Sequence, residues 1–108
     1  MKRGDVWWAV LDQPKGPRPV LLISRQKAID IRSFVTIVEI TTTMRNLRTE
    51  VVLGAPDGLP KTCVANADNI GTIAKRRLQR WITTLSPARM SEVDSSLRFA
   101  LGLDAYFV

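Results

Sequence analysis

The stretch FVTIVEITT at residues 34–42 is the strongest indication of the fold in this sequence. It is dominated by β-branched and aromatic residues, which favour extended strands. Side chains alternate between the two faces of a strand, so Phe34, Val38 and Ile40 share one face and Glu39 and Thr41 share the other. We expect the apolar face to pack against the core, and Glu39 and Thr41 to point outward or toward a groove.

Shorter strand-like segments lie on both sides of this stretch. Enrichment in β-branched or aromatic residues predicts strands at residues 5–11, 18–24, 48–53, 62–67, 70–73 and 81–85. Turn-forming residues separate them, most densely at 13–17 (QPKGP) and 55–60. The charged residues 25–33 are predicted to be irregular with at most a helical turn, and residues 75–80 to form a basic turn or short helix.

One clear helix is predicted near the end of the chain. Ser86 suits the N-cap and Pro87 the first helical position, and Gly102 is a natural stop. Between them an apolar stripe recurs at three- and four-residue steps, formed by Met90, Val93, Leu97 and Leu101. We therefore predict a mainly β fold with α, a small and partly closed antiparallel β-barrel with a C-terminal helix packed on it, in a single domain spanning residues 1–108.

The composition narrows the possible sites and partners. The chain has 108 residues, a formal net charge of +6 and a pI of about 10.3. This positive charge favours a polyanionic binding partner, nucleic acid first and an acidic protein segment second. An ordinary basic surface would have the same charge. A single cysteine, Cys63, excludes an internal disulfide and is expected to be a buried small hydrophobe. The absence of histidine excludes a Cys/His metal site and imidazole catalysis.

Membrane insertion is not expected from the sequence. No apolar run approaches the ~18 residues that span a bilayer, and no signal peptide is recognisable behind Met1. We expect a cytoplasmic protein with no membrane partner.

Four features are candidates for chemistry. Arg18 lies between two prolines that stiffen the start of a strand, where a guanidinium suits bidentate phosphate contacts. The threonine run 41–43 places hydroxyl donors at a strand end. Residues 66–73 (NADNIGTI) carry groups that hydrogen-bond base edges. A basic cluster with an adjacent Trp81 suits single-stranded nucleic acid and comprises Lys75, Arg76, Arg77 and Arg80.

Each feature alone also has a commoner structural explanation. These are a turn arginine paired to a carboxylate, threonines that suit a strand end, an Asn/Asp turn and a solvated basic face. The tandem Trp7 and Trp8 must point to opposite faces of their strand, so we expect one ring in the core and the other at a groove or interface.

Taken together and in order, these segments resemble one family, the MazF/PemK toxin endoribonucleases. The resemblance is carried by RGDVWWAVLD (3–12), RPVLLIS (18–24), VEITTT (38–43), TEVVL (49–53), GLPKTCVANADNIGTI (58–73) and RRL (76–78). The segment LSPARMSEVDSSLRFALGL (85–103) resembles that family's C-terminal helix. The resemblance implies an SH3-like or CcdB-like barrel that works as a homodimer, cleaves single-stranded RNA without a metal ion or other cofactor, and is silenced by a cognate acidic antitoxin.

The resemblance also implies residue roles. The family's catalytic arginine falls on Arg18, in Arg-Pro-Val, and its catalytic threonine on Thr41, in Ile-Thr. We expect the candidate substrate-binding residues to be Lys15, Thr42, Asn69, Lys75, Arg76 and Arg77. The family's reaction is attack by the ribose 2′-OH on the adjacent phosphate, which leaves a 2′,3′-cyclic phosphate and a 5′-OH.

That reaction suits a chain without histidine, because the nucleophile belongs to the substrate. The protein must stabilise the charge of the phosphorane and move protons. We expect Arg18 to stabilise this charge and to be a candidate proton donor to the leaving 5′-oxygen, and Thr41 to hydrogen-bond a non-bridging oxygen. A guanidinium stays protonated, so the proton acceptor is unassigned, and Glu39, on the face of Thr41, is one candidate.

The sequence departs from many relatives in the loop at residues 13–17, where they carry a longer Gly-Ser-Glu-Gln-like stretch. Asn69 and Gly71 also stand where many relatives have Gln and Arg, so a cleavage sequence is not transferred. Two other functions stay open, a non-catalytic CcdB-like toxin that acts on a protein and a plain RNA-binding barrel. Surfaces expected to be buried in a homodimer are one face of Trp7–Trp8 and the C-terminal Tyr106 and Phe107.

Overall fold

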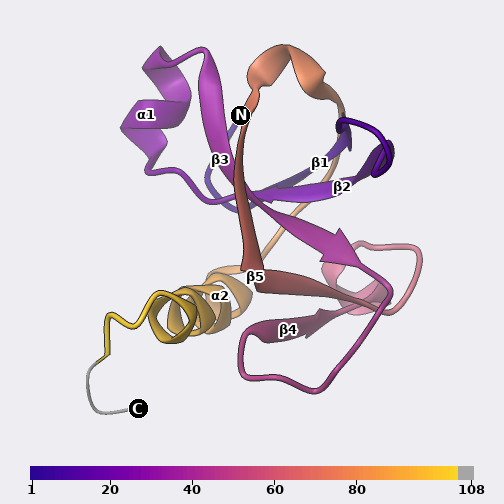
Figure 1. The fold of residues 1–108 in the computed structure, drawn as a ribbon, viewed down its shortest axis with the longest axis vertical. Coiled ribbons are helices and arrows are strands. Elements are labelled where there is room, and N and C mark those ends of the chain that lie inside the picture. The colour runs from indigo at the N-terminus through magenta and orange to yellow at the C-terminus, as the bar shows by residue number, and fades with distance from the viewer. Residues whose placement is uncertain (105–108) are drawn as a thin grey trace.

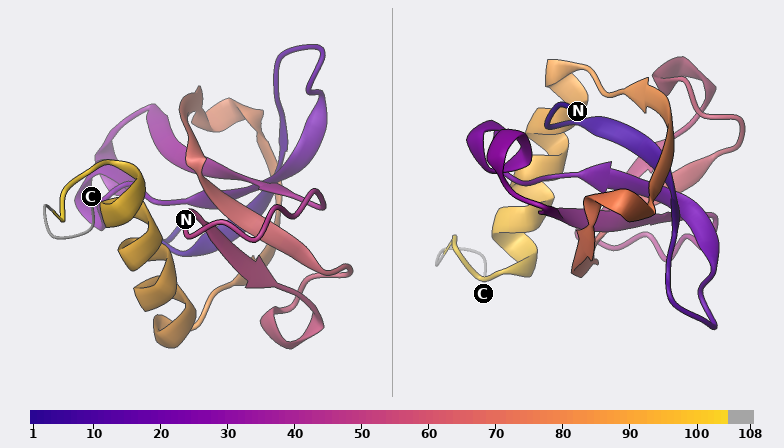
Figure 2. Two further views of the ribbon diagram at one scale, coloured as in Figure 1. Left: turned by 60° about the horizontal axis from the view of Figure 1, so that its bottom comes forward. Right: turned by 90° about the horizontal axis from the view of Figure 1, so that it is seen from above.

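The computed structural model describes residues 1–104, and within them six strands form one antiparallel sheet in the order β4-β5-β3-β2-β1-β6. The strands are β1 (Asp5–Val10), β2 (Pro17–Leu22), β3 (Phe34–Thr41), β4 (Glu50–Leu53), β5 (Cys63–Ala74) and β6 (Leu78–Thr84). The sheet curls into a half-barrel, and α2 (Pro87–Ala100) lies along one side of it (Figure 1; Figure 2). The predicted mainly β, partly closed barrel with a C-terminal helix is confirmed.

Apolar clusters cover both faces of the central strands. One cluster lies between the sheet and α2 and includes Val38 and Ile40 of β3 together with Val93 and Leu97 of the helix. The other includes Val35 and Ile37 of β3 and Ile29 of α1 (Gln26–Ile31). Because β3 is buried on both sides, its apolar run is continuous rather than alternating.

This double burial corrects one expectation about β3. Phe34 was expected in the core, but it is 56% exposed at the start of the strand, whereas Val35 and Ile37 on the opposite face are buried. The same face carries Glu39 and Thr41 farther along the strand. The Glu39 carboxylate and the Thr41 hydroxyl therefore lie on a face of β3 that is buried in the core at its other end.

Two predicted strands, at 62–67 and 70–73, are in fact one strand, β5. The separation expected around Asp68 and Asn69 appears as a bulge, because Val38 pairs with Ile70 whereas the next residue, Glu39, pairs with Asn66. The Asp68 N–H donates to the Asn66 side-chain oxygen at 2.9 Å, so the local turn chemistry is satisfied inside the strand. The basic segment is also shorter than expected, since a 3₁₀ turn covers Lys75–Arg77 and β6 begins at Leu78.

The predicted helix forms as α2, and its N-terminus has the predicted cap. Ser86 Oγ accepts a hydrogen bond from the Arg89 N–H at 3.2 Å, and Pro87 occupies the first turn. Leu101, expected in the apolar stripe, is 56% exposed just beyond the last turn. Residues 25–33, expected to be irregular or to form a helical turn, contain the short helix α1. Tyr106 and Phe107 lie outside the described residues. Among those described, no helix has the length and apolar character needed to cross a membrane.

Candidate active site

The turn between β1 and β2 carries the first two basic residues of the candidate site. The strands pair with Ala9 opposite Arg18, and the short connection brings Lys15 back over the start of β2. Arg18 Nη2 donates to the Lys15 carbonyl oxygen at 3.2 Å, so the guanidinium is tied to the turn itself. Arg18, which was predicted to lie on a stiff stretch of backbone, is therefore found at the start of β2. Its side chain is about one third exposed there.

Strand β3 brings Glu39 and Thr41 beside Arg18. Val20 of β2 pairs with Glu39 in an antiparallel register. Continuing that register by two residues places Arg18 opposite Thr41, on the same face of the sheet. Arg18 and Thr41, to which the resemblance assigns catalysis, are thus neighbours on adjacent strands. Glu39 lies between them and the core.

Glu39 is the centre of the polar contacts at this site. It is only 8% exposed, and each carboxylate oxygen contacts a different cation. Oε1 accepts from Arg18 Nη1 at 3.2 Å, and Oε2 accepts from Lys15 Nζ at 2.5 Å. Glu39 was expected to point outward or toward a groove. Its carboxylate points toward a groove, because Glu39 and Lys15 line a cavity of about 270 Å³ below the β1–β2 turn.

Arg18 has a donor to spare. Its Nε is buried and has no hydrogen-bond partner among the described residues. Buried donors without acceptors are uncommon and cost free energy, so a shift of the Arg18 side chain that brought this nitrogen to an anionic oxygen would be favourable. A phosphate is such a group, and a guanidinium binds two of its oxygens in a fork.

A second, mostly apolar cavity of about 320 Å³ opens on the other face of the sheet at the same end of β3. Its walls include Trp8, Pro19 and Ile40, with Leu59 and Cys63 from the loop and the start of β5. Polar groups at its boundary come from Thr41, Thr42 and Lys61. The threonines that end β3 therefore border the apolar cavity, whereas Glu39, two residues before Thr41, lines the other one. Of the tandem tryptophans, one ring was expected in the core and the other at a groove or interface. The structure agrees, since Trp7 packs on a core cluster and Trp8 lines the apolar cavity.

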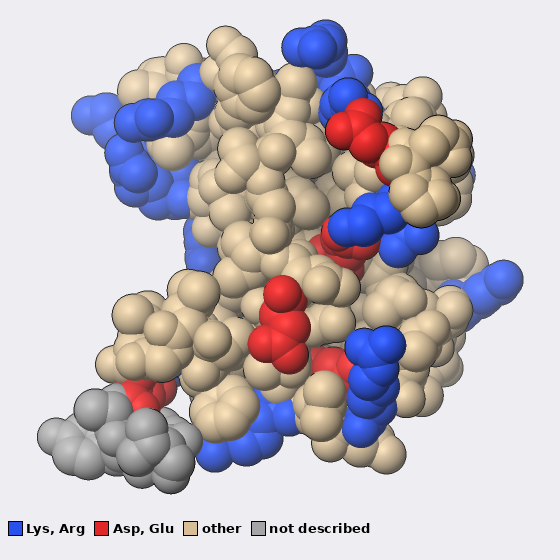
Figure 3. Space-filling view, in the orientation of Figure 1, with Lys and Arg blue, Asp and Glu red and all other residues tan. Residues whose placement is uncertain are grey.

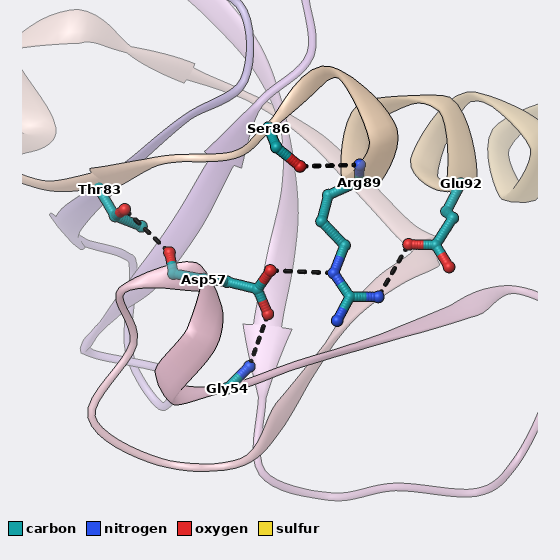
Figure 4. A network of polar contacts seen from close by, with 6 residues as sticks. All are labelled: Gly54, Asp57, Thr83, Ser86, Arg89 and Glu92. Atoms are coloured by element: carbon teal, nitrogen blue, oxygen red, sulfur yellow. Dashed lines mark hydrogen bonds and ion pairs between the residues drawn. The ribbon is translucent and has the colours of Figure 1, made fainter.

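The loop that forms one wall of the apolar cavity is anchored to α2 by a polar network that sequence reasoning missed (Figure 4). Asp57 Oδ1 accepts from Arg89 Nε at 2.9 Å, and Oδ2 accepts from the Gly54 N–H at 3.0 Å. Arg89 also donates to Glu92, and Thr83 Oγ1 donates to the Asp57 carbonyl oxygen. The only sequence signal was Asp57 three residues after Gly54, the spacing of a side-chain cap. These contacts fix residues 59–61 beside Thr42.

The predicted basic cluster divides into inward and outward members. Lys75 Nζ donates to the Ile29 carbonyl oxygen of α1. Arg77 donates to the Val10 carbonyl oxygen at 3.1 Å and pairs with Asp12 at 2.8 Å. Arg76 is exposed beside a hollow that shares Leu11, Asp12, Thr72 and Ile73 with the Glu39 cavity. Arg76 and Arg77 therefore extend the site along the sheet, whereas Lys75 braces α1.

Other predicted residues lie farther from these cavities. Asn69 is exposed in the β5 bulge and lines neither the Glu39 cavity nor the apolar one. Figure 3 shows basic side chains over α1 and, across the same face, around the β1–β2 turn, where acidic side chains lie between them. The positive charge is therefore interrupted at the site by carboxylates, of which Glu39 is the most buried.

Cys63 is buried in the wall of the apolar cavity, as expected of a small hydrophobe. Burial raises the pKa of its thiol, and the nearby Asp57 carboxylate raises this pKa further. Both effects favour the protonated thiol, which is a weak nucleophile. Cys63 therefore contributes shape to the cavity rather than chemistry.

Comparison with known proteins identifies the family of this chain. Residues 2–101 match the profile of the family described as "PemK-like, MazF-like toxin of type II toxin-antitoxin system". The chain is 41% identical over 103 residues to a protein of Mycobacterium tuberculosis named "Probable endoribonuclease MazF2", covering 94% of this chain and 99% of the relative. It is 36% identical over 101 residues to "Endoribonuclease MazF4" of the same organism, covering 94% and 92%.

Solved structures agree in fold over nearly the whole chain. One, described as "Endoribonuclease in complex with its cognate antitoxin from Mycobacterial species", superposes with a TM-score of 0.85 at 35% identity and covers 95% of this chain and 96% of the other. Another, "Mycobacterium tuberculosis toxin MazF-mt6", gives a TM-score of 0.85 at 33% identity with 93% and 98% covered.

Proposed function

Since this chain belongs to the PemK-like, MazF-like toxins of type II toxin–antitoxin systems, we propose that it is an endoribonuclease that cleaves single-stranded RNA at selected sequences without a metal ion. The observation that carries the proposal is the pairing of Val20 with Glu39, because continuing this register by two residues places Arg18 opposite Thr41 beside a basic turn. Two of its relatives are named endoribonucleases. The RNA substrate places the proposed activity in the cytoplasm.

The proposed reaction assigns each group a task that its chemistry allows. The substrate's 2′-oxygen attacks the adjacent phosphorus, and the bond to the 5′-oxygen breaks, which gives a 2′,3′-cyclic phosphate and a 5′-OH. Arg18 neutralises the charge that develops on the phosphorane through its Nη atoms, each of which has a second N–H beyond its contact with Glu39 or Lys15. Thr41 donates its hydroxyl to a non-bridging oxygen, and a water molecule held by Arg18 is the candidate donor to the leaving oxygen, because the guanidinium itself stays protonated.

Substrate binding is proposed along the two cavities. Lys15, Arg76 and Arg77 line the cation-rich side and would neutralise phosphates. The apolar cavity beside Thr42 offers a surface against which an unstacked base can pack. Lys75 and Asn69 remain weaker candidates, because the first contacts α1 and the second lies in the β5 bulge.

The test is cleavage of total RNA by the purified protein in EDTA. We expect discrete fragments with 2′,3′-cyclic phosphate ends, and we expect them to disappear with Arg18→Ala. Arg25→Ala is the matched control, since it removes an exposed arginine at the far end of the β2–α1 connection. Intact RNA together with growth arrest on expression would instead indicate a toxin that acts on a protein. RNA binding without cleavage or arrest would indicate a plain RNA-binding barrel.

Two partners follow from the same proposal. A homodimer is supported by the exposed edge strand β6, on which Trp81 is 55% exposed. A stable dimer would bury roughly 1,600 Å² or more in total, and a monomer at micromolar concentration in sedimentation equilibrium would contradict it. The second partner is an acidic antitoxin that competes with RNA for the Arg18 side of the molecule. Inhibition of cleavage by the product of a neighbouring small acidic reading frame would test it.

A further inference from the structure

Glu39 is a buried carboxylate for which the fold alone gives no reason. Its strand neighbours Ile37 and Ile40 are apolar and buried, and an apolar residue would continue the core at this position. Burying a carboxylate is costly unless cations and hydrogen bonds compensate, and a buried ion pair is weak evidence for a stabilising role. Here the compensation comes from Arg18 and Lys15, the same two cations that the proposed function assigns to the RNA phosphate.

We propose that Glu39 is the catalytic base of this site, which accepts the proton of the substrate's 2′-OH. The inference rests on the proposed ribonuclease function and assigns the one role that the family motif leaves open. The O2′–H bond breaks as the O2′–P bond forms, and the proton goes to a Glu39 oxygen. The P–O5′ bond breaks, the 5′-oxygen takes a proton from a water molecule, and the resulting hydroxide recovers the proton from Glu39.

The geometry brings the base to the nucleophile. The Glu39 Oε1 atom lies 3.2 Å from Arg18 Nη1, so a phosphate held by that guanidinium sits directly beside the carboxylate. The reacting 2′-oxygen is only three bonds removed from the 3′-oxygen of the same phosphodiester. A base must come within about 2.6–3.2 Å of the proton-bearing oxygen, and a carboxylate adjacent to the phosphate-binding arginine has this reach.

The charges around Glu39 also explain how a paired carboxylate becomes available. The groups facing it are Arg18 from β2, Lys15 from the β1–β2 turn, and Asp12, which lines the same cavity and is itself paired with Arg77. An incoming phosphate competes for Arg18 and Lys15, which are strong hydrogen-bond donors to phosphate. When it takes these donors, the Glu39 oxygens lose their partners at the moment when the 2′-OH arrives.

This exchange predicts effects of opposite sign on binding and on catalysis. In the free protein the carboxylate occupies the cations that RNA needs, and in the complex it repels the phosphate. Glu39→Gln removes both obstacles, so RNA should bind more tightly. The same substitution removes the proton acceptor, so cleavage should slow. A residue that merely supports the fold would weaken both together.

The experiment measures both quantities on an oligonucleotide that contains a mapped cleavage site. The dissociation constant is measured with an analogue that has 2′-deoxyribose at the cleaved position, and the rate is measured in single turnover from about pH 3 to 9, a range that extends below the ordinary pKa of a glutamate. For Glu39→Gln we expect the rate to fall 100-fold or more, the usual contribution of a general base, while the analogue binds at least as tightly as to the wild type. The acid limb of the pH–rate profile should disappear.

Two further variants make the outcome decisive. Glu39→Asp keeps a carboxylate but withdraws it by one methylene, so it should retain the acid limb at a reduced rate. Asp94→Asn is the matched control, because it removes a carboxylate of α2 that pairs with Arg3 of the N-terminal segment and should leave the rate unchanged. Tight binding of the analogue by Glu39→Gln also shows that this variant is folded.

Other results would overturn the inference. An unchanged rate and acid limb in Glu39→Gln would exclude Glu39 as the base while leaving the ribonuclease function intact. Parallel loss of binding and cleavage, with a lower melting temperature, would assign Glu39 a structural role instead. If the wild type cleaves no RNA at all, the proposed function fails and the role of Glu39 fails with it.

Discussion

Gly58 is the position where the structure most sharply limits substitution, and we expect Gly58→Ala to destabilise the fold strongly. Gly58 ends the 3₁₀ turn Ala55–Asp57 with a φ of +88°, a region that costs an L-residue roughly 1–2 kcal/mol. A Cβ atom there would lie 2.4 Å from Thr83 Oγ1 and 2.9 Å from Thr83 Cβ, so Thr83 has to move.

The cost of that movement can be estimated from what Thr83 contributes. Its hydroxyl donates to the Asp57 carbonyl oxygen at 2.9 Å, a bond that contributes about 1 kcal/mol. Forcing the side chain off its rotamer adds roughly 0.5–1.5 kcal/mol. We therefore expect Gly58→Ala to lower the free energy of unfolding by about 2.5–4.5 kcal/mol, measured by equilibrium urea unfolding at one fixed protein concentration.

Gly16→Ala is the matched control. Gly16 also has a positive φ, +62°, but a Cβ there would meet only the Gln13 amide nitrogen at 3.8 Å. It should show the backbone cost alone, so the two variants should differ by roughly 1.5–2.5 kcal/mol, the sum of the two Thr83 contributions. Equal destabilisation by both substitutions would refute the reasoning, because it would mean that Thr83 gives way without cost.

Three further predictions concern the cap, the thiol and the basic face. Ser86→Ala removes the acceptor of the Arg89 N–H and should lower the free energy of unfolding by about 1 kcal/mol in the same urea assay. Burial raises the pKa of the Cys63 thiol, so at alkaline pH the folded chain keeps a proton that the unfolded chain loses. The contribution of this thiol to the free energy of unfolding is therefore complete at neutral pH and declines as the pH rises above the pKa of the thiol in the unfolded chain. Cys63→Ala should flatten that alkaline decline in unfolding measurements, and a decline of the same steepness would contradict the assignment. Arg76→Ala should weaken RNA binding at all sequences and reduce the slope of log affinity against log salt by about one, as measured by fluorescence anisotropy.

Local sequence patterns predicted the strands well where one segment forms one strand. β2 and β3 begin and end within two residues of expectation, and the cap and first turn of α2 are those predicted. The pattern failed at β5 because Asn66 and Asp68 are turn-forming residues, whose hydrogen bond is made inside a bulged strand. At α1 it indicated no more than a helical turn because Arg25 offers no side-chain cap, so burial of Ala28 and Ile29, rather than local preference, stabilises that helix.

Sequence patterns located residues whose placement depends on strand position, whereas the catalytic roles of these residues are proposals. Arg18 and Thr41 could be placed because strand ends and alternation follow from sequence, and the resemblance added their roles. The Glu39 contacts could not be predicted, since they depend on the register between β2 and β3 and on the fold of the turn that carries Lys15. The Asp57–Arg89 anchor joins residues 32 positions apart and likewise depends on tertiary packing.

The short connection between β1 and β2 explains how so small a site is assembled without histidine. The Leu11 N–H donates to the Gly16 carbonyl oxygen at 2.9 Å, which closes the turn and returns Lys15 over the sheet. A longer loop would carry its polar groups away from the strands, whereas this one holds an ammonium against the Glu39 carboxylate at 2.5 Å. Arg18 holds the other oxygen of that carboxylate and also contacts the turn. Lys15, Arg18 and Glu39 therefore form one charged cluster. An anion that displaces the Glu39 carboxylate contacts both cations at once. A phosphodiester makes that exchange, and it leaves a buried carboxylate beside the 2′-OH without any further group having to move into place.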